Sequence, residues 1–207
     1  MPLLLELSDA NTSLIVYQMK EEDSFYLSGI DFTPFDHQEF NSIVNPLKRR
    51  QWLASRYWVK KLSKQHNQLY LEKSDLGKPH FTNSHLKFSI SHSKDCVAVI
   101  CSETKEVAID IEVMQDKILK IKSKFLHPLD YEQGSDIEEI TKIWSAKETI
   151  YKFYHSKSLY SFKEQIAILN SSANSLPYSI SNFPNQSNHE VFYKKIEDLI
   201  LTWIIEN

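Results

Sequence analysis

The stretch EVAIDIEVM, residues 106–114, alternates between two kinds of side chain. Every odd-numbered residue from 107 to 113 is valine or isoleucine, whereas Asp110 and Glu112 occupy even-numbered positions. Because successive side chains of a β-strand point to opposite faces, this pattern predicts a strand with one apolar face and one face that carries two carboxylates. A solvated strand edge is one interpretation of the acidic face. A cation site is the other, because neighbouring carboxylates repel each other unless a cation lies between them.

Two amphipathic helices are predicted, one before and one after this strand. Residues 46–66 carry apolar side chains at helical spacing, and Pro46 follows Asn45, an arrangement typical of a first helical turn. Residues 136–157 are expected to form the second helix, with Asp136 as its cap. The core face of this second helix is predicted to consist of Ile143, Ala146, Ile150, Phe153 and Tyr154.

Shorter segments complete an α+β pattern. Strands are predicted over residues 13–19 and 87–102, and a further helix over residues 118–126. Strand, helix and strands thus occur in each half, which predicts an α+β fold of two lobes, residues 1–103 and residues 104–207. After the second long helix only strands are expected, over residues 162–169, 175–183, 190–196 and 199–207.

The composition is typical of a globular protein with a sizeable core. The 207 residues are 42% hydrophobic, and no run of about 18 apolar residues is present that could span a membrane. Residues 1–14 lack the positive segment that begins a signal peptide, so a cytoplasmic location is expected. Cys96 and Cys101 lie on opposite faces of one predicted strand and are therefore expected to be free thiols.

The charge distribution indicates an anionic ligand or an acidic partner. The net charge is −3, yet residues 41–71 contain no Asp or Glu and include Arg49, Arg50, Arg56 and Lys60. The overall balance does not indicate a nucleic-acid partner. The chain has only three glycines and contains neither GxGxxG nor the P-loop motif, which excludes both kinds of glycine-rich phosphate site. Phosphates would have to be bound by side chains and a metal.

A third carboxylate is expected from the second long helix, in the segment WSAKETIYK, residues 144–152. Trp144, Glu148 and Lys152 form an i, i+4, i+8 row that points away from the core face. Lys147, beside Glu148, adds a second cation. The alternative is an ordinary surface ion pair between Glu148 and Lys152, which would contribute only about 0.3 kcal/mol.

Two further candidates lie in the first half of the chain. His92 stands between Ser91 and Ser93 in the segment ISHS, where a phosphate donor and a turn cap are both open interpretations. Lys78 belongs to a Gly-Lys-Pro turn that is predicted to follow a short strand within residues 71–81. This lysine is either a phosphate ligand or a solvated turn residue.

Five segments occur in the order RRQWLASRYW, GKPHF, FSISHS, AIDIE and WSAKETIYKFY, within residues 45–165. Together they resemble the 4′-phosphopantetheinyl transferases of the Sfp type, in the holo-acyl-carrier-protein synthase superfamily. No single segment is decisive, and the resemblance depends on the ordered set. It implies an α+β fold of two similar lobes, with coenzyme A bound in the cleft between them.

The resemblance also implies a reaction. The phosphopantetheine arm of coenzyme A would move to a serine hydroxyl of an acyl or peptidyl carrier protein, with Mg²⁺ as cofactor and 3′,5′-ADP as product. Such carriers are generally acidic, which fits the basic side chains of Arg49, Arg56 and Lys60, and solubility is the alternative role of that basic face. The chain is expected to act as a monomer, without a nucleic-acid or membrane partner.

The same resemblance implies roles for individual residues. Mg²⁺ would be bound by Asp110, Glu112 and Glu148, and Asp110 and Glu148 would act in catalysis together with Lys152. Arg49, Arg50 and Arg56 compete for the role of the family's arginine. Coenzyme A would be bound by a set from both halves of the chain, namely Arg50, Arg56, Lys78, Ser91, His92, Lys147 and Lys152.

The group that takes the proton from the carrier serine stays open. The family often has a glutamate after the metal motif, whereas KFLHPLDYEQ offers Asp130, with Glu132 nearby. Glu148, Asp130, Glu132 and a water molecule are the candidates. The missing glutamate also motivates a second hypothesis, a non-catalytic member that binds coenzyme A or a carrier protein. A different metal-dependent phosphoryl-transfer enzyme is a third.

Overall fold

The computed structural model describes residues 3–63, 69–75, 77–155, 159–181 and 190–206. It divides the chain into two compact units, here unit 1 (residues 1–107 and 205–207) and unit 2 (residues 108–204). Each unit contains helices and antiparallel strand pairs, which confirms the predicted α+β class. Within the described ranges, no helix is long and apolar enough to cross a membrane.

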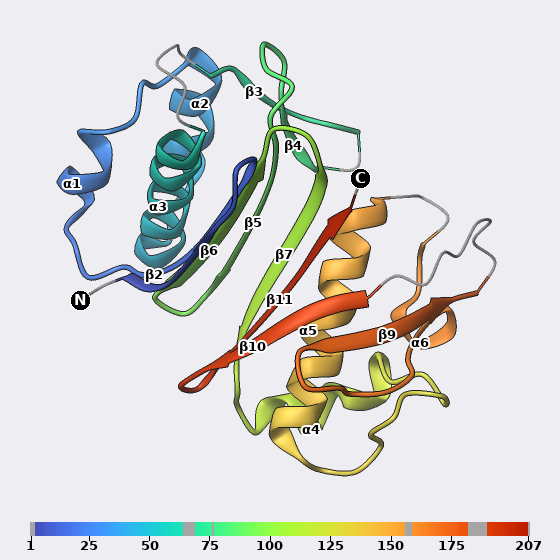
Figure 1. Ribbon diagram of the computed structural model, residues 1–207. Helices are drawn as coiled ribbons and strands as arrows, with labels where there is room; N and C mark the ends of the chain where they lie inside the picture. The colour runs from blue at the N-terminus through green and yellow to red at the C-terminus, as the bar shows by residue number, and fades with distance from the viewer. Residues whose placement is uncertain (1–2, 64–68, 76, 156–158, 182–189, 207) are drawn as a thin grey trace. The chain divides into compact units, whose positions relative to one another are not determined.

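Unit 1 consists mainly of a four-stranded antiparallel sheet with a long helix on one face (Figure 1). The helix is α3 (Pro46–Leu62), and Asn45 caps it by accepting a hydrogen bond from the amide of Lys48 at 3.0 Å. The end predicted for this helix, residues 64–66, lies outside the described residues. Apolar side chains of α3 share one core with those of three of the strands. The strands are, in spatial order, β1 (Leu3–Ser8), β2 (Thr12–Gln18), β6 (Cys96–Ser102) and β5 (Lys87–Ser93).

Unit 1 also contains several short elements, of which only a short strand within residues 71–81 is predicted from the sequence. The helices α1 (Asp23–Leu27) and α2 (Pro34–Ser42) precede α3, and β3 (Leu71–Lys73) pairs with β4 (Pro79–Phe81). A capping box starts α2, because the Thr33 hydroxyl accepts from the Asp36 amide and the Asp36 carboxylate accepts from the Thr33 amide. This local signal, and not an apolar stripe, specifies where α2 begins.

Unit 2 packs one long helix, α5 (Ile137–Tyr154), with a five-stranded sheet (Figure 1). As predicted, Asp136 caps α5 by accepting hydrogen bonds from the amides at positions 138 and 139. Ile143, Ala146 and Ile150 of α5 are fully buried in a core shared with the sheet. The sheet consists, in spatial order, of β7 (Glu106–Val113), β11 (Leu199–Glu206), β10 (Glu190–Ile196), β9 (Ser175–Ile180) and β8 (Ile166–Ile168).

Two segments of unit 2 differ from their predicted structure. Residues 162–169 are not one strand, because the Ser161 hydroxyl accepts from the Glu164 amide at 3.3 Å and starts the short helix α6 (Phe162–Gln165) before β8. Residues 118–126 do not form one helix either. They contain most of α4 (Lys117–Ile121) and the 3₁₀ turn η1 (Lys122–Lys124).

The two cysteines lie in unit 1, on β6. Both Cys96 and Cys101 are free and buried, as their spacing predicts. The chain therefore contains no disulfide, and the two units are stabilised by their apolar cores.

Candidate active site

Asp110 and Glu112 lie on the face of β7 that is turned toward α5. The Asp110 carboxylate accepts hydrogen bonds from Lys152 Nζ and from Ser145 Oγ, each at 2.8 Å. The Glu112 carboxylate accepts from Trp144 Nε1 at 2.9 Å. Asp110 is only 3% exposed. The acidic face of the strand is therefore not a solvated edge.

Helical spacing explains why these groups meet. Trp144, Glu148 and Lys152 are four residues apart and form one row along α5, as predicted. Lys152 Nζ also donates to the backbone oxygen of Ile109 at 3.1 Å, which holds its ammonium against β7. The predicted charged side chains, Asp110 and Glu112 of β7 and Glu148 and Lys152 of α5, thus lie together between this strand and this helix.

Glu148 adds a third carboxylate to this group. The pKa of Glu148 is raised to about 7, mainly by burial and further by the negative charges of Asp110 and Glu112, while Lys152 partly opposes the shift. No described residue donates a hydrogen bond to the Glu148 carboxylate. Glu148 therefore differs from Asp110 and Glu112, whose carboxylates are held by fixed donors.

The three carboxylates do not by themselves enclose a metal ion. Within the described ranges, no three His, Cys, Asp or Glu side chains are arranged to bind a metal together. The donor set nevertheless has the right chemistry for a hard cation, since Mg²⁺ takes oxygen ligands and often uses only one or two carboxylates together with water and phosphate oxygens. A divalent cation would also relieve the repulsion that raises the pKa of Glu148.

Lys147 points away from this group and into the core of unit 2. It is 0% exposed, and its Nζ donates to Asp130 Oδ2 at 2.7 Å and to the backbone oxygen of Phe125 at 2.8 Å. Burial lowers the pKa of Lys147, and the charge of Asp130 opposes that effect. The expectation that Lys147 contacts coenzyme A is corrected, because the side chain has no surface available to a ligand. Its position between Ile143 and Ile150 on the core face is the signal that could have shown this.

Asp130 is buried by the same network. Besides Lys147, its carboxylate accepts from the amides of His127 at 2.7 Å and Ile168 at 2.8 Å. These bonds connect the loop before α5 to β8, and the side chain of Asp130 is completely buried. Glu132 accepts a hydrogen bond from the amide of Gly134 in its own turn. Asp130 therefore has a structural role and is not available to take a proton from a substrate.

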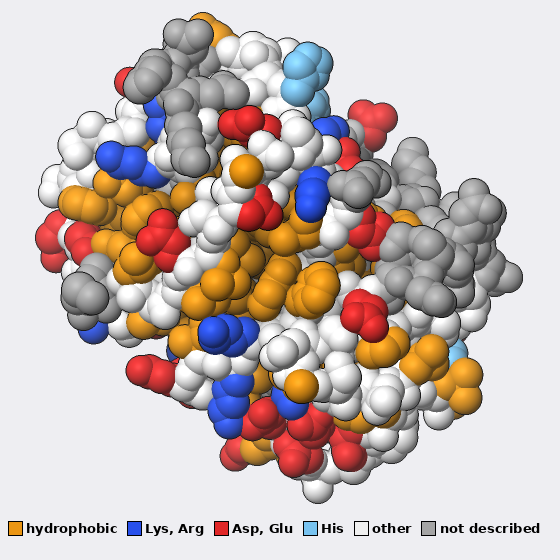
Figure 2. Space-filling view, viewed as in Figure 1, with side chains coloured by type: hydrophobic (Ala, Val, Ile, Leu, Met, Phe, Trp, Pro, Cys, Tyr) orange, Lys and Arg blue, Asp and Glu red, His pale blue; other side chains and the backbone are white. Residues whose placement is uncertain are grey.

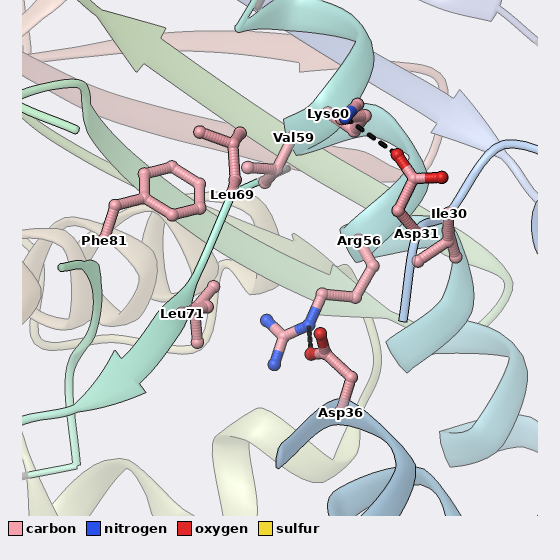
Figure 3. Close-up of a pocket in the computed structure, with 9 residues that line it drawn as sticks. All are labelled: Ile30, Asp31, Asp36, Arg56, Val59, Lys60, Leu69, Leu71 and Phe81. Atoms are coloured by element: carbon pink, nitrogen blue, oxygen red, sulfur yellow. Dashed lines mark hydrogen bonds and ion pairs between the residues drawn. The ribbon is translucent and has the colours of Figure 1, made fainter. Parts of the chain in front are cut away.

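Three basic side chains of α3, those of Arg50, Arg56 and Lys60, pair with carboxylates of unit 1. Figure 3 shows Arg56 and Lys60 turned toward aspartates at the wall of a cavity of about 40 Å³. In the space-filling view, basic and acidic side chains are interspersed over the visible face (Figure 2). Part of the positive charge of segment 41–71 is therefore balanced by carboxylates, whereas Lys48 and Lys61 are exposed and Arg49 stacks on the ring of Phe40. The ion pairs are Arg50–Asp23, Arg56–Asp36, Arg56–Glu39 and Lys60–Asp31, with N···O distances of 2.8 to 3.1 Å.

A larger cavity of unit 1, about 390 Å³ in volume, combines two of the predicted coenzyme A ligands. Arg56 of α3 and His92 of β5 both line it, and Lys48 and Lys73 add positive charge. Ser91 precedes His92 in β5, so its side chain lies on the opposite face of the strand. The cavity thus brings together a guanidinium, an imidazole and two ammonium groups with the carboxylate of Glu39, which pairs with Arg56 and Lys73.

Lys78 occupies the predicted Gly-Lys-Pro turn. The turn requires Gly77, whose φ of +85° is in the left-handed region that other residues rarely adopt. The amide of Gly77 donates to the backbone oxygen of Ser74 at 2.8 Å. The amide of Ser74 in turn donates to the backbone oxygen of Lys78 at 2.9 Å. Burial lowers the pKa of Lys78, and the nearby Glu106 opposes the shift. Lys78 is therefore a partly desolvated cation, a typical property of functional lysines.

Ser145 is a residue of the site that the sequence analysis missed. It lies between Trp144 and Lys147 on α5, and its hydroxyl holds one oxygen of Asp110. A serine in the middle of a helix is unfavourable unless its hydroxyl has a specific partner, and this was the available signal.

Comparison with known proteins gives the family of this region. Residues 106–204 match the family model of the 4′-phosphopantetheinyl transferase superfamily. The match begins with β7 and ends within β11, so it includes all three carboxylates and Lys152. No curated protein sequence matches the chain. Residues 106–204 therefore form a domain of the 4′-phosphopantetheinyl transferase superfamily, as the ordered motifs predict.

Proposed function

We propose that the protein is a Mg²⁺-dependent 4′-phosphopantetheinyl transferase of the Sfp type. It transfers the phosphopantetheine arm of coenzyme A to a serine of an acyl or peptidyl carrier protein and releases 3′,5′-ADP. The observation that carries this proposal is the group formed by Asp110, Glu148 and Lys152 inside the matched domain. Transfer from a pyrophosphate requires charge stabilisation on both phosphates, and such a group can organise it.

The metal would be held by Asp110, Glu112 and Glu148. Their all-oxygen donor set and the mutual repulsion felt by Glu148 support this assignment. When bound, Mg²⁺ supplies Lewis-acid stabilisation of the phosphate oxygens. Lys152 contributes a positive charge from the protein itself, and its ammonium lies 2.8 Å from Asp110 Oδ1.

Glu148 is the proposed acceptor of the serine proton. The carrier serine oxygen forms a bond to the β-phosphorus of coenzyme A, its proton moves to the Glu148 carboxylate, and the bond from the β-phosphorus to the oxygen of 3′,5′-ADP breaks. Lys152 stabilises the charge that develops on this leaving phosphate. The choice of Glu148 over Asp130 is supported by the burial of Asp130 in its pair with Lys147. It is also supported by the Glu148 carboxylate, to which no described residue donates a hydrogen bond.

Coenzyme A binding is proposed to use the larger cavity of unit 1. His92 and Lys48 line it and supply donors for phosphate oxygens, and Lys73 lines it with its ammonium paired with Glu39. Arg56 lines the same cavity, although its guanidinium is also paired with Asp36 and Glu39. The other residues proposed for coenzyme A are Arg50, Lys78, Ser91 and Lys152.

The acidic carrier protein is proposed to dock on the lysines of α4 and η1 and not on α3. Lys117, Lys120 and Lys124 are exposed, and none of them makes a hydrogen bond or ion pair with another described residue. Arg50, Arg56 and Lys60 of α3 are instead already paired with carboxylates. An acidic helix of a carrier would gain charge complementarity at α4 and η1.

A mass-shift assay tests the proposed function. The protein is incubated with apo carrier proteins, coenzyme A and Mg²⁺, and each carrier is weighed by mass spectrometry. The expected result is a gain of about 340 Da, the mass of the transferred group in this chemistry. Unmodified carriers together with calorimetric binding of coenzyme A would instead identify a non-catalytic binding protein. Unmodified carriers without coenzyme A binding would overturn both assignments.

A further inference from the structure

Three buried hydroxyl groups form a chain that ends on Asp110. Ser145 and Thr149 lie one turn apart on α5, and Thr202 lies on β11. Ser145 Oγ is 2.8 Å from Asp110 Oδ2 and 2.8 Å from Thr202 Oγ1. Thr202 Oγ1 is 2.6 Å from Thr149 Oγ1. All three hydroxyl-bearing residues are 0% exposed, so water does not compete for these bonds.

The hydrogens of this chain have one consistent direction. Ser145 Oγ donates its hydrogen to Asp110 Oδ2. The single hydroxyl hydrogen of Ser145 is then used, and Ser145 accepts from Thr202. Thr202 Oγ1 in turn accepts from Thr149 at 2.6 Å, the shorter of two contacts of that hydroxyl, which also lies 3.4 Å from the backbone oxygen of Thr202. All three O–H dipoles therefore point toward Asp110, and hydrogen bonds arranged in such a chain strengthen one another.

The location of the chain argues against a role in packing alone. A buried hydroxyl is unfavourable compared with an apolar group unless it is hydrogen-bonded, and α5 fills equally buried positions with Ile143, Ala146 and Ile150. The polar positions lie where α5 and β11 flank Asp110. Lys152 Nζ donates a hydrogen bond to the other oxygen of that carboxylate, Oδ1, at 2.8 Å. The carboxylate is thus fixed from two sides, with Oδ2 turned to the hydroxyl chain and Oδ1 to Lys152.

We propose that Ser145, Thr202 and Thr149 are positioning residues that hold Asp110 in the orientation for binding Mg²⁺. The inference rests on the proposed function, in which Asp110 is a metal ligand. Groups that orient a metal-binding carboxylate change metal affinity by about 10- to 100-fold when they are removed. The effect of each hydroxyl on the metal should therefore fall with its distance along the chain from Asp110.

A titration with Mn²⁺ in place of Mg²⁺ tests this order. The full chain, with coenzyme A present, is titrated while free Mn²⁺ is measured by electron paramagnetic resonance. Ser145→Ala should raise the Kd for Mn²⁺ about tenfold or more, Thr202→Val less, and Thr149→Val least. Valine keeps nearly the shape of threonine, so the two valine variants remove hydroxyl groups without opening a cavity.

Thr141→Val is the matched control. Thr141 is 1% exposed on the same helix, and its hydroxyl donates to the backbone oxygen of Ile137 at 2.6 Å. This variant should keep the Kd of the wild type within about twofold, while thermal unfolding of every variant reports stability separately.

The possible outcomes separate this inference from the proposed function. If the wild type binds Mn²⁺ and Ser145→Ala and Thr202→Val bind it equally tightly, the hydroxyl chain is structural and the inference is overturned alone. If the wild type does not bind Mn²⁺, both the metal site and the inference are overturned. A graded loss of affinity with Thr141→Val unaffected supports the inference.

Discussion

At position 147, a lysine occupies a place that helical periodicity assigns to the core. Its ammonium is matched by Asp130, and both side chains are completely buried. Lys147→Met would leave the Asp130 carboxylate buried without its counter-ion, so we expect the free energy of unfolding to fall by about 3–5 kcal/mol. Urea unfolding measures this change.

Lys195→Met provides the comparison for Lys147→Met. Lys195 pairs with Glu138 on the surface, and the loss of that exposed pair should change the free energy of unfolding by less than about 1 kcal/mol. If Lys147→Met keeps the stability of the wild type but loses affinity for coenzyme A, the structural role of Lys147 is contradicted. That result would instead support a contact between Lys147 and a phosphate of coenzyme A.

At position 148, the burial of the Glu148 carboxyl makes the free energy of unfolding depend on pH when a chelator keeps the protein free of metal. Burial and then Asp110 raise the pKa of Glu148 to about 7 from an ordinary value of 4.5. The folded state therefore holds this proton more tightly than the unfolded state. The resulting stability is fully present below pH 4.5 and is lost as the pH rises through about 7.

Glu148→Gln should remove this pH dependence. Between about pH 5 and pH 8 the wild type is expected to lose about 2–3 kcal/mol more of its unfolding free energy than the variant does. Glu138→Gln should follow the wild type, because the hydrogen bond from Lys195 lowers the pKa of Glu138 and moves its titration below this range. Equal slopes for the wild type and Glu148→Gln in urea unfolding would show that Glu148 is not buried as described.

At the scale of elements, α4 and η1 carry the prediction about the carrier protein. Reversing the charges of Lys117, Lys120 and Lys124 to glutamate should raise the KM for an acidic carrier about tenfold or more and leave the KM for coenzyme A unchanged. Steady-state kinetics at two salt concentrations measure both, and the wild type should lose more carrier affinity with added salt than the variant. The surface residues Lys194 and Lys195 of β10, changed to glutamate, form the control. An equal rise in KM for that control would indicate general electrostatics instead of docking at α4.

Elements with strong local signals are the ones that sequence predicts. The apolar stripe and Asn45 cap define α3, the Asp136 cap defines the start of α5, and strict alternation defines β7. The short helix α6 was missed because a single hydroxyl, that of Ser161, starts a four-residue helix inside a segment rich in strand-forming residues. In such a segment a capping side chain decides between helix and strand, and hydrophobic periodicity does not detect that cap.

At the scale of the whole molecule, the α+β class follows from the order of helices and strands, but the partners of individual side chains do not. Asp110, Glu148 and Lys152 were predictable because they share a strand face and a helix row. The bond from Thr202 to Ser145 joins residues 57 positions apart, and the pairing of Lys60 with Asp31 joins residues 29 apart. Only the folded chain reveals that Arg50, Arg56 and Lys60 are paired with carboxylates and that a buried hydroxyl holds Asp110 Oδ2.

The measurement that tests the central claim most directly is the mass of an apo carrier protein after incubation with coenzyme A and the enzyme, with Mg²⁺ or with a chelator. The wild type and Glu138→Gln are expected to add about 340 Da in the presence of Mg²⁺ only. Asp110→Asn and Glu148→Gln are expected to add nothing, although both should remain folded. Full modification by either of these two variants, or by the wild type in the presence of chelator, would contradict the account.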